Sequence, residues 1–154
     1  MYRVVRSFDG KEATREFEVT AEVDAPNDRV WATLTEVEAW PEWTASITSV
    51  EAPADGWLAP GGAVRIRQPG MGTLRWEVVG LEPGAAFTWR HQSPGVTTEG
   101  SHRIEPTPDG RSEVTLGIRQ WGPLAPLVGL ISARRIRRYM HLEADGLKRR
   151  CEAG

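Results

Sequence analysis

The chain has one cysteine, Cys151, and no long apolar run. A single cysteine excludes an internal disulfide and a zinc site built from several cysteines. Its place near the end of the chain predicts an exposed thiol without a role. No stretch approaches the roughly 18 consecutive apolar residues of a membrane-spanning helix, and the N-terminal residues lack an apolar signal core. We therefore expect a cytoplasmic protein with no stable membrane insertion.

Motifs for cofactors and for common catalytic centres are also missing. The chain has no Gly-rich phosphate loop, no His-Glu-x-x-His metal motif and no Gly-x-Ser-x-Gly nucleophile elbow. We therefore expect no metal and no other cofactor. The net charge of −2 gives no overall basic field, so no nucleic-acid partner is expected. These absences leave open whether the protein is an enzyme.

The composition fits one globular domain. With 154 residues, of which 40% are hydrophobic and 26% charged, the chain is long enough to bury a core by itself. Residues 1–14 are expected to form an N-terminal arm or a short strand at Arg3–Phe8. Residues 15–150 are expected to form the domain, and residues 151–154 a tail.

Alternation of apolar and polar residues predicts the strands. The first is Arg15–Val23, where Phe17, Val19, Ala21 and Val23 alternate with polar residues. After a helix that starts at Pro26 and a short helical piece at Glu36–Trp43, Pro-Gly and Asp-Gly dipeptides separate further runs of strand length. The later strands are predicted at Ser46–Glu51, Ala63–Gln68, Thr73–Leu81, Ala86–Gln92, Val96–Glu105 and Arg111–Trp121. Consecutive hairpins of this kind require an antiparallel sheet.

The last segment, from about Gly122 to Arg150, has a long helical pattern. On a helical wheel, one side carries the apolar set Val128, Ile131, Tyr139 and Leu142, with Ile136 and Leu147 at its margin. Arg135 projects from the middle of this apolar side. A helix that covers a curved sheet while pointing a cation inward indicates an enclosed space as well as a packed core.

The order of elements resembles the START-like (SRPBCC) helix-grip superfamily, in particular its polyketide cyclase/dehydrase and lipid-transport group. The resemblance rests on the opening strand from Phe17, the Ala25-Pro26 helix start, the Val30-Trp31 pair and Trp40-Pro41-Glu42-Trp43. It implies an α+β fold in which a curved antiparallel sheet of about seven strands wraps a long C-terminal helix, with two short helices after the first strand. Members bind lipids, sterols, polyketides or plant hormones, and only some are catalysts.

Strand parity predicts which polar side chains face the helix. Gln68, His91, His102 and Gln120 fall on inward positions, with Arg135 facing them from the helix. A cavity with a few convergent polar groups is typical of a small-molecule site. The predicted ligand-binding residues are therefore Gln68, Trp76, Trp89, His91, His102, Ile118, Gln120, Ile131, Arg135 and Tyr139. Inward carboxylates are scarce on the strands, because Glu77, Glu99 and Glu113 have the outward parity.

Alternatives remain for each charged candidate. His91 and His102 are candidate acid–base groups, since histidine titrates near neutrality, but each can equally be a buried histidine bonded to backbone. Arg135 either holds an anionic group of a ligand, or pairs with a protein carboxylate, or faces solvent. The basic run from Arg134 to Arg138 can also meet nucleic acid or an anionic membrane, but such a run is more often a solvated helix surface.

The sequence thus predicts binding, or transport, of a small hydrophobic or lipid-like ligand between the sheet and the C-terminal helix. A first alternative is a polyketide cyclase or dehydratase in which His91 or His102 transfers a proton. A second is a partner-binding module, such as a homodimer or a toxin–antitoxin type component, with a cavity that has no function. The ligand itself is not predictable from these patterns.

Overall fold

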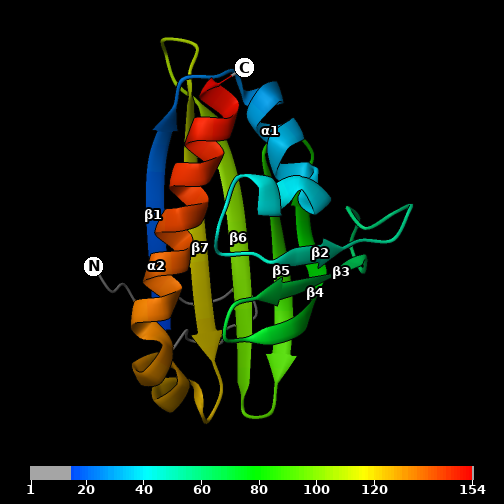
Figure 1. Ribbon diagram of the computed structural model, residues 1–154, viewed down its shortest axis with the longest axis vertical. Coiled ribbons are helices and arrows are strands. Elements are labelled where there is room, and N and C mark those ends of the chain that lie inside the picture. The colour runs from blue at the N-terminus through cyan, green and yellow to red at the C-terminus, as the bar shows by residue number, and fades with distance from the viewer. Residues whose placement is uncertain (1–14, 154) are drawn as a thin grey trace.

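The computed structural model describes residues 15–153 as a long helix lying across one curved sheet (Figure 1). The possible strand at Arg3–Phe8 lies outside these residues. The elements in chain order are β1 (Arg15–Val23), α1 (Asn27–Thr35), the 3-10 helix η1 (Val37–Glu42), β2 (Ser49–Glu51), β3 (Ala63–Gln68), β4 (Gly72–Glu82), β5 (Ala86–Ser93), β6 (Val96–Pro106), β7 (Ser112–Trp121) and α2 (Ala125–Glu152). This is the predicted helix-grip architecture.

The seven strands of the described chain form one antiparallel sheet in the order β1-β7-β6-β5-β4-β3-β2. The predicted hairpins therefore join neighbouring strands from β3 to β7. The first strand lies beside the last one, with Arg15 opposite Gln120 and Val23 opposite Ser112. Gly95 in the β5–β6 turn has a φ of +77°, a conformation that explains why glycine stands there.

The predicted strand at Ser46–Glu51 is shorter in the structure and begins at Ser49. The residues before it form a turn instead. The hydroxyl oxygens of Thr44 and Ser46 lie 2.7 Å apart, and the amide of Ser46 also donates to Thr44 Oγ1 at 3.3 Å. Local side-chain bonds of this kind compete with strand pairing, which accounts for the difference.

The concave face of the sheet and the underside of α2 enclose the core. The buried residues of α2 are Ala125, Gly129, Met140, Ala144, Gly146, Leu147 and Cys151. Several of them are small, so the helix approaches its neighbours closely; a Cβ on Gly146 would lie only 1.9 Å from the carbonyl oxygen of Trp43.

Two expectations about α2 are wrong. Ile131 was expected to face the cavity but is 75% exposed, because small residues rather than the largest apolar ones make the contacts of the helix. Cys151 was expected to be an exposed thiol but is fully buried. The helix continues to Glu152, which carries Cys151 into the core, and burial raises the pKa of the thiol.

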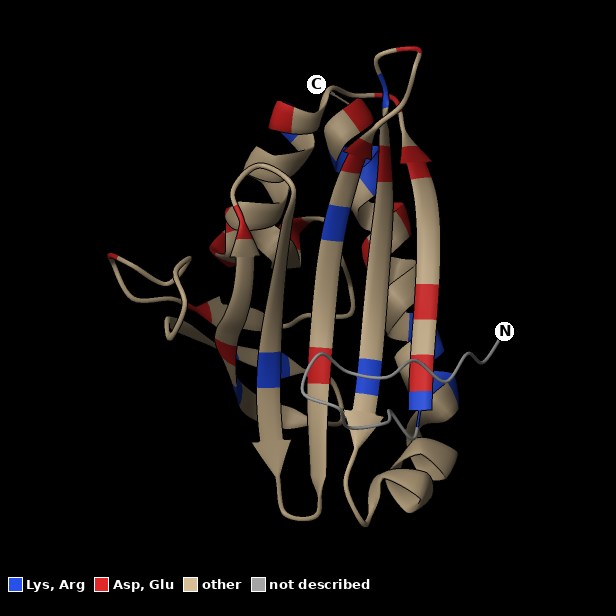
Figure 2. Ribbon diagram, turned by 180° about the vertical axis from the view of Figure 1, so that it is seen from behind, with Lys and Arg blue, Asp and Glu red and all other residues tan. Residues whose placement is uncertain are grey.

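Charged residues recur along the strands of the sheet, which Figure 2 shows from the side opposite α2. Glu99, on the outward parity as predicted, accepts hydrogen bonds from Arg90 at 2.9 and 3.2 Å across β5 and β6. This polar face and the apolar concave face establish which side of each strand meets α2. The site is therefore on the concave side.

Candidate functional site

Two adjoining cavities lie between the sheet and α2. The inner chamber has a volume of about 70 Å³ and the outer chamber about 180 Å³. They share the wall residues Gln68, Trp76, Ile118, Met140 and Glu143. Exposed Arg135 is part of the outer wall, so the outer chamber reaches the protein surface.

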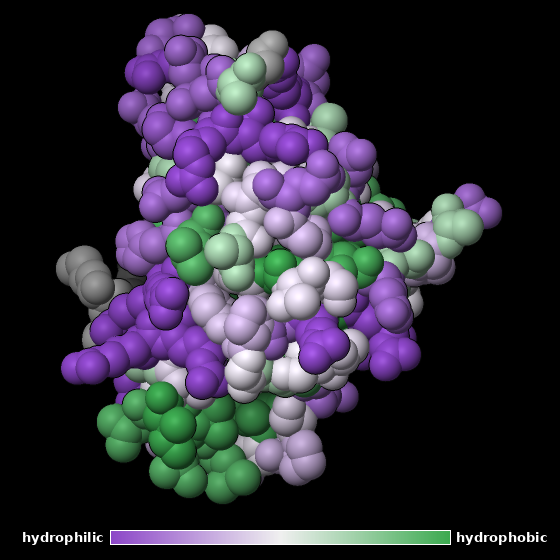
Figure 3. All heavy atoms as spheres, in the orientation of Figure 1, coloured by the Kyte–Doolittle hydropathy of each residue, from purple (hydrophilic) through white to green (hydrophobic). Residues whose placement is uncertain are grey.

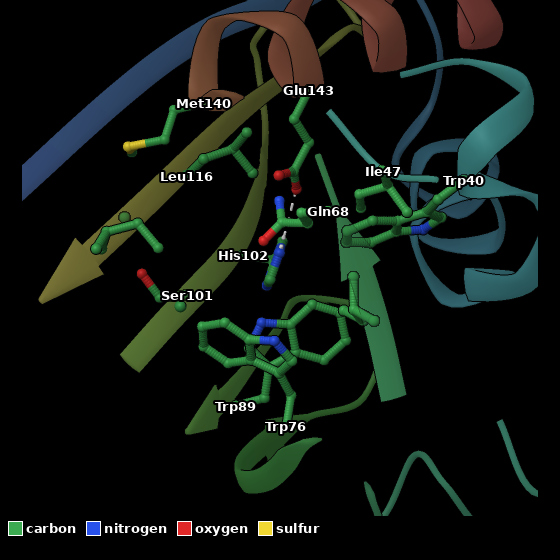
Figure 4. A pocket seen from close by; sticks show the side chains of 14 residues that line it. Trp40, Ile47, Gln68, Trp76, Trp89, Ser101, His102, Leu116, Met140 and Glu143 are labelled. Carbon is green, nitrogen blue, oxygen red and sulfur yellow. Dashed lines mark ion pairs between the residues drawn. The ribbon is translucent and has the colours of Figure 1, made fainter. Parts of the chain in front are cut away.

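Aromatic and aliphatic side chains make up most of the inner chamber (Figure 4). The rings of Trp76 and Trp89 lie 6.0 Å apart, and Trp89 also contacts Trp40 at 5.4 Å. All three tryptophans are less than 10% exposed. The inner chamber is therefore shaped for a flat or cyclic apolar group.

His102 is the central polar group of the inner chamber. Its ring stacks on Phe87, with centroids 4.2 Å apart and an interplanar angle of 15°, and it meets the edges of Trp40 and Trp89. The side chain is 5% exposed. Contacts with three aromatic rings hold the imidazole in one orientation.

Glu143 on α2 faces His102 across the chamber (Figure 4). His102 Nε2 lies 3.3 Å from Glu143 Oε1, within ion-pair distance when the imidazole is protonated. The contact does not have hydrogen-bond geometry, and among the described residues His102 Nδ1 has no partner either. The sheet and the helix thus each supply one titratable group to the same enclosed space.

Sequence reasoning missed Glu143, because it searched for inward carboxylates by strand parity alone. A signal was present in the helix. Glu143 lies seven residues after Ile136 and three after Met140, and it precedes Leu147 by four. These spacings put all four side chains on one face of a helix.

The outer chamber brings together most of the other predicted site residues. Gln120 donates from Nε2 to Thr98 Oγ1 at 3.4 Å, while its Oε1 is buried and has no hydrogen-bond partner in residues 15–153. Trp76 Nε1 is unpartnered in the same way among the described residues. An unsatisfied buried polar atom costs about 1–3 kcal/mol, so these atoms mark places where a bound molecule would be stabilised.

His91 also lines the outer chamber but is already bonded. Its Nδ1 lies 3.0 Å from the carbonyl oxygen of Arg75, and its Nε2 lies 2.8 Å from Ser93 Oγ. The β5–β6 register puts His91 opposite Thr98 and His102 opposite Phe87, so the two histidines are four register positions apart. Both ring nitrogens of His91 therefore have a hydrogen-bond partner, whereas Nδ1 of His102 has none among the described residues.

Arg135 and Tyr139 form the rim of the outer chamber on the helix side. Arg135 Nη1 donates to the carbonyl oxygen of Gly70 at 3.2 Å, and the Tyr139 hydroxyl donates to that of Pro69 at 2.5 Å. Both bonds tie α2 to the β3–β4 turn. Arg135 thus lies at the cavity mouth, neither deep inside nor paired with a carboxylate by any contact found among residues 15–153.

The predicted site residues other than Ile131 all line one of the two chambers. Gln68, Trp76 and Ile118 line both, whereas His102 and Trp89 belong to the inner one. His91, Gln120, Arg135 and Tyr139 belong to the outer one. Whether a ligand contacts them remains a prediction.

Known structures share this fold. The ZhuI aromatase/cyclase from Streptomyces sp. R1128 is 20% identical, with a TM-score of 0.74 over 90% of this chain and 93% of that chain. A START superfamily protein from Mycobacterium smegmatis is 17% identical, with a TM-score of 0.68 over 90% and 97%. The di-domain aromatase/cyclase BexL of the BE-7585A biosynthetic pathway is 23% identical, with a TM-score of 0.69 over 88% of this chain and 45% of that chain.

No curated protein matches the chain. A family model does match, described as polyketide cyclase / dehydrase and lipid transport, over residues 14–152. That range includes β1, α2 and both chambers. The chain therefore belongs to the polyketide cyclase/dehydrase and lipid transport family.

Proposed function

We propose that the chain binds a small, largely apolar cyclic molecule that carries hydroxyl or carbonyl groups. The observation that carries this proposal is a set of buried polar atoms on residues that line the two chambers and have no hydrogen-bond partner among the described residues: His102 Nδ1, Trp76 Nε1 and Gln120 Oε1. An indole N–H needs a hydrogen-bond acceptor, and an amide oxygen needs a hydrogen-bond donor. A phenol or an enol supplies both from one oxygen.

The chambers also set the size and orientation of the ligand. Each is smaller than the roughly 300–1,000 Å³ of typical drug-sized sites, which favours one or two rings. Glu143 disfavours an anionic group at the inner end, whereas Arg135 favours one at the mouth. The apolar body would therefore lie among the tryptophans, with any negative charge directed outward.

A second candidate function, proton transfer in a cyclisation or dehydration, is favoured by the His102–Glu143 pair. A histidine beside a carboxylate in an enclosed site is a common acid–base arrangement. His102 would take a proton from the carbon next to a ligand carbonyl, and Glu143 would stabilise the imidazolium. The proton would then pass to a departing hydroxyl, which leaves as water. Two proteins of similar structure, ZhuI and BexL, are named as aromatase/cyclases, which agrees with this chemistry.

Calorimetric titration with 2-naphthol tests the binding proposal. Ile118→Phe puts a larger side chain into the wall that both chambers share, and it is expected to weaken binding at least tenfold. Ile131→Phe makes the same change on the exposed side of α2 and is the matched control, expected to bind like the unchanged protein. Native mass spectrometry of protein purified from its cells should show a co-purified small molecule. An empty protein that also ignores 2-naphthol would overturn the proposal.

Proton transfer can be measured separately with 1-tetralone in D₂O. If the second candidate is right, the protein accelerates deuterium incorporation next to the carbonyl, and His102→Gln lowers this rate by about 100-fold or more while affinity changes only a few-fold. Glu143→Gln should give a smaller loss. If the unchanged protein does not accelerate the exchange, and His102→Gln only loses affinity, proton transfer is contradicted and binding is the sole function.

A further inference from the structure

The N-terminal end of α2 carries a concentrated apolar surface. Leu124, Leu127, Leu130 and Ile131 are 46%, 55%, 70% and 75% exposed, and we call these four residues the apolar tip. Figure 3 shows apolar side chains gathered at this end of the molecule, with hydrophilic ones directly beside them. Among the residues that the structure describes, Val79 is the only other large hydrophobic residue with comparable exposure.

Arginines follow the apolar tip along the helix. Arg134, Arg135, Arg137 and Arg138, which we call the arginine belt, are all exposed at the residue level. Three of them line a surface hollow of about 360 Å³ together with Pro69 and Tyr139, and no acidic residue takes part. Residues 114–142 contain no aspartate or glutamate, although the whole chain has a net charge of −2.

The charge beside the apolar tip decides whether a second copy of the chain or an anionic surface covers it. A two-fold dimer through this surface would bring the same patch of each copy together, and so would set one arginine belt close to the other. The two turns that border the patch, Pro69–Gly72 and Ser93–Gly95, add no acidic residue to offset this repulsion. The patch instead matches a surface that offers apolar depth and negative charge together.

We propose that the apolar tip and the arginine belt dock the protein onto an anionic phospholipid bilayer. The leucines and Ile131 would enter the boundary between headgroups and acyl chains, while the arginines pair with phosphates. The docking is peripheral, since no helix of the described chain is long and apolar enough to cross a membrane. It does not depend on which molecule the cavity binds.

The proposed docking surface lies beside the mouth of the outer chamber. Val128, within the span of the tip, and Ser132, between the tip and the belt, line the outer chamber. Arg135 belongs to both the belt and the chamber mouth. Docking would therefore place the mouth near the lipid. An apolar ligand could pass between membrane and cavity without crossing bulk water.

Vesicle co-sedimentation tests the proposal. The protein is expected to bind vesicles of phosphatidylcholine mixed with phosphatidylglycerol more strongly than phosphatidylcholine alone, and added salt should weaken this preference. Leu127→Gln/Ile131→Gln is expected to lower partitioning at least tenfold, whereas Val79→Gln, at an exposed apolar site away from α2, should not. Circular dichroism should show unchanged folding in each variant.

The arginines have their own matched comparison. Arg134→Gln/Arg138→Gln should lower binding to anionic vesicles about 30-fold, the effect of two cations lost at an anionic surface. Arg65→Gln/Arg149→Gln removes two exposed arginines outside the belt and should change it little. Absence of binding to anionic vesicles at low salt, or binding that the tip variant retains, would overturn the proposal. So would a stable dimer that the tip variant dissociates, because a second copy would then cover the patch.

Discussion

The C-terminal half of α2 buries Met140, Ala144 and Leu147, whereas the N-terminal half leaves Leu127, Leu130 and Ile131 largely exposed. Both halves contain leucines, so the presence of large apolar residues does not separate them. Their neighbours do. The C-terminal half lies against α1 as well as the sheet (Figure 1), and its Gly146 lies against Trp43, while the N-terminal half lies beside β1, β7 and the outer chamber.

The difference between the halves assigns them different tasks. Burial of the C-terminal half fixes the helix on the domain and holds Glu143 against His102. The N-terminal half contributes little buried apolar surface, which leaves it available for a ligand or a lipid surface. Substitutions in the two halves should therefore have opposite consequences for stability and for binding.

The largest expected contrast is between two leucines. Leu147→Ala removes a fully buried side chain and should lower the free energy of unfolding by about 2–5 kcal/mol. Leu130→Ala removes one that is 70% exposed and should change it by less than about 0.5 kcal/mol. Urea titration followed by circular dichroism measures both. Equal losses would mean that the two halves are anchored alike.

Two glycines give the next contrast. A Cβ on Gly146 would lie 1.9 Å from the carbonyl oxygen of Trp43, a backbone atom that cannot move without shifting η1. Gly146→Ala should therefore cost about 1–3 kcal/mol of stability. A Cβ on Gly129 would meet the flexible side chain of Arg15, and the higher helix propensity of alanine offsets part of the strain. Gly129→Ala should be close to neutral in the same urea titration.

Prediction from sequence succeeded where periodicity alone decides. Alternation set the inward face of each strand, and turn dipeptides set the hairpins, so Trp76, Trp89 and Gln120 were placed correctly. The helix was harder, since its contact stripe uses Gly129, Ala144 and Gly146, to which a hydrophobic wheel gives little weight. The helical wheel therefore put Ile131 on the contact side of α2, whereas the structure puts it on the exposed side.

The polar contents of the site depended on tertiary contacts. The position of Arg135 at the rim depends on where the β3–β4 turn meets α2, which no local pattern records. The pairing of His102 with Glu143 joins residues 41 positions apart in the chain. The surroundings of Cys151 likewise follow from the packing of the helix end.

The smallest predicted effect on stability concerns Cys151. Burial raises the pKa of its thiol, so the folded state disfavours the thiolate. The stability from this group is complete below the ordinary thiol pKa and declines as pH rises through the folded value, since the unfolded state ionises first. Native protein should react with Ellman's reagent far more slowly than urea-unfolded protein. Equal rates would mean that the C-terminal end of α2 is not packed as described.

Methyl NMR of isoleucine-labelled protein during a titration with 2-naphthol tests the ligand cavity most directly. Four isoleucines line the two chambers, namely Ile47, Ile66, Ile118 and Ile136. Ile104 is buried elsewhere in the core and Ile131 is exposed on α2. We predict saturable shifts for methyl groups of the lining residues, with Ile104 and Ile131 unchanged. Saturable shifts confined to Ile104 or Ile131, or none at any lining residue, would contradict a binding site between the sheet and α2.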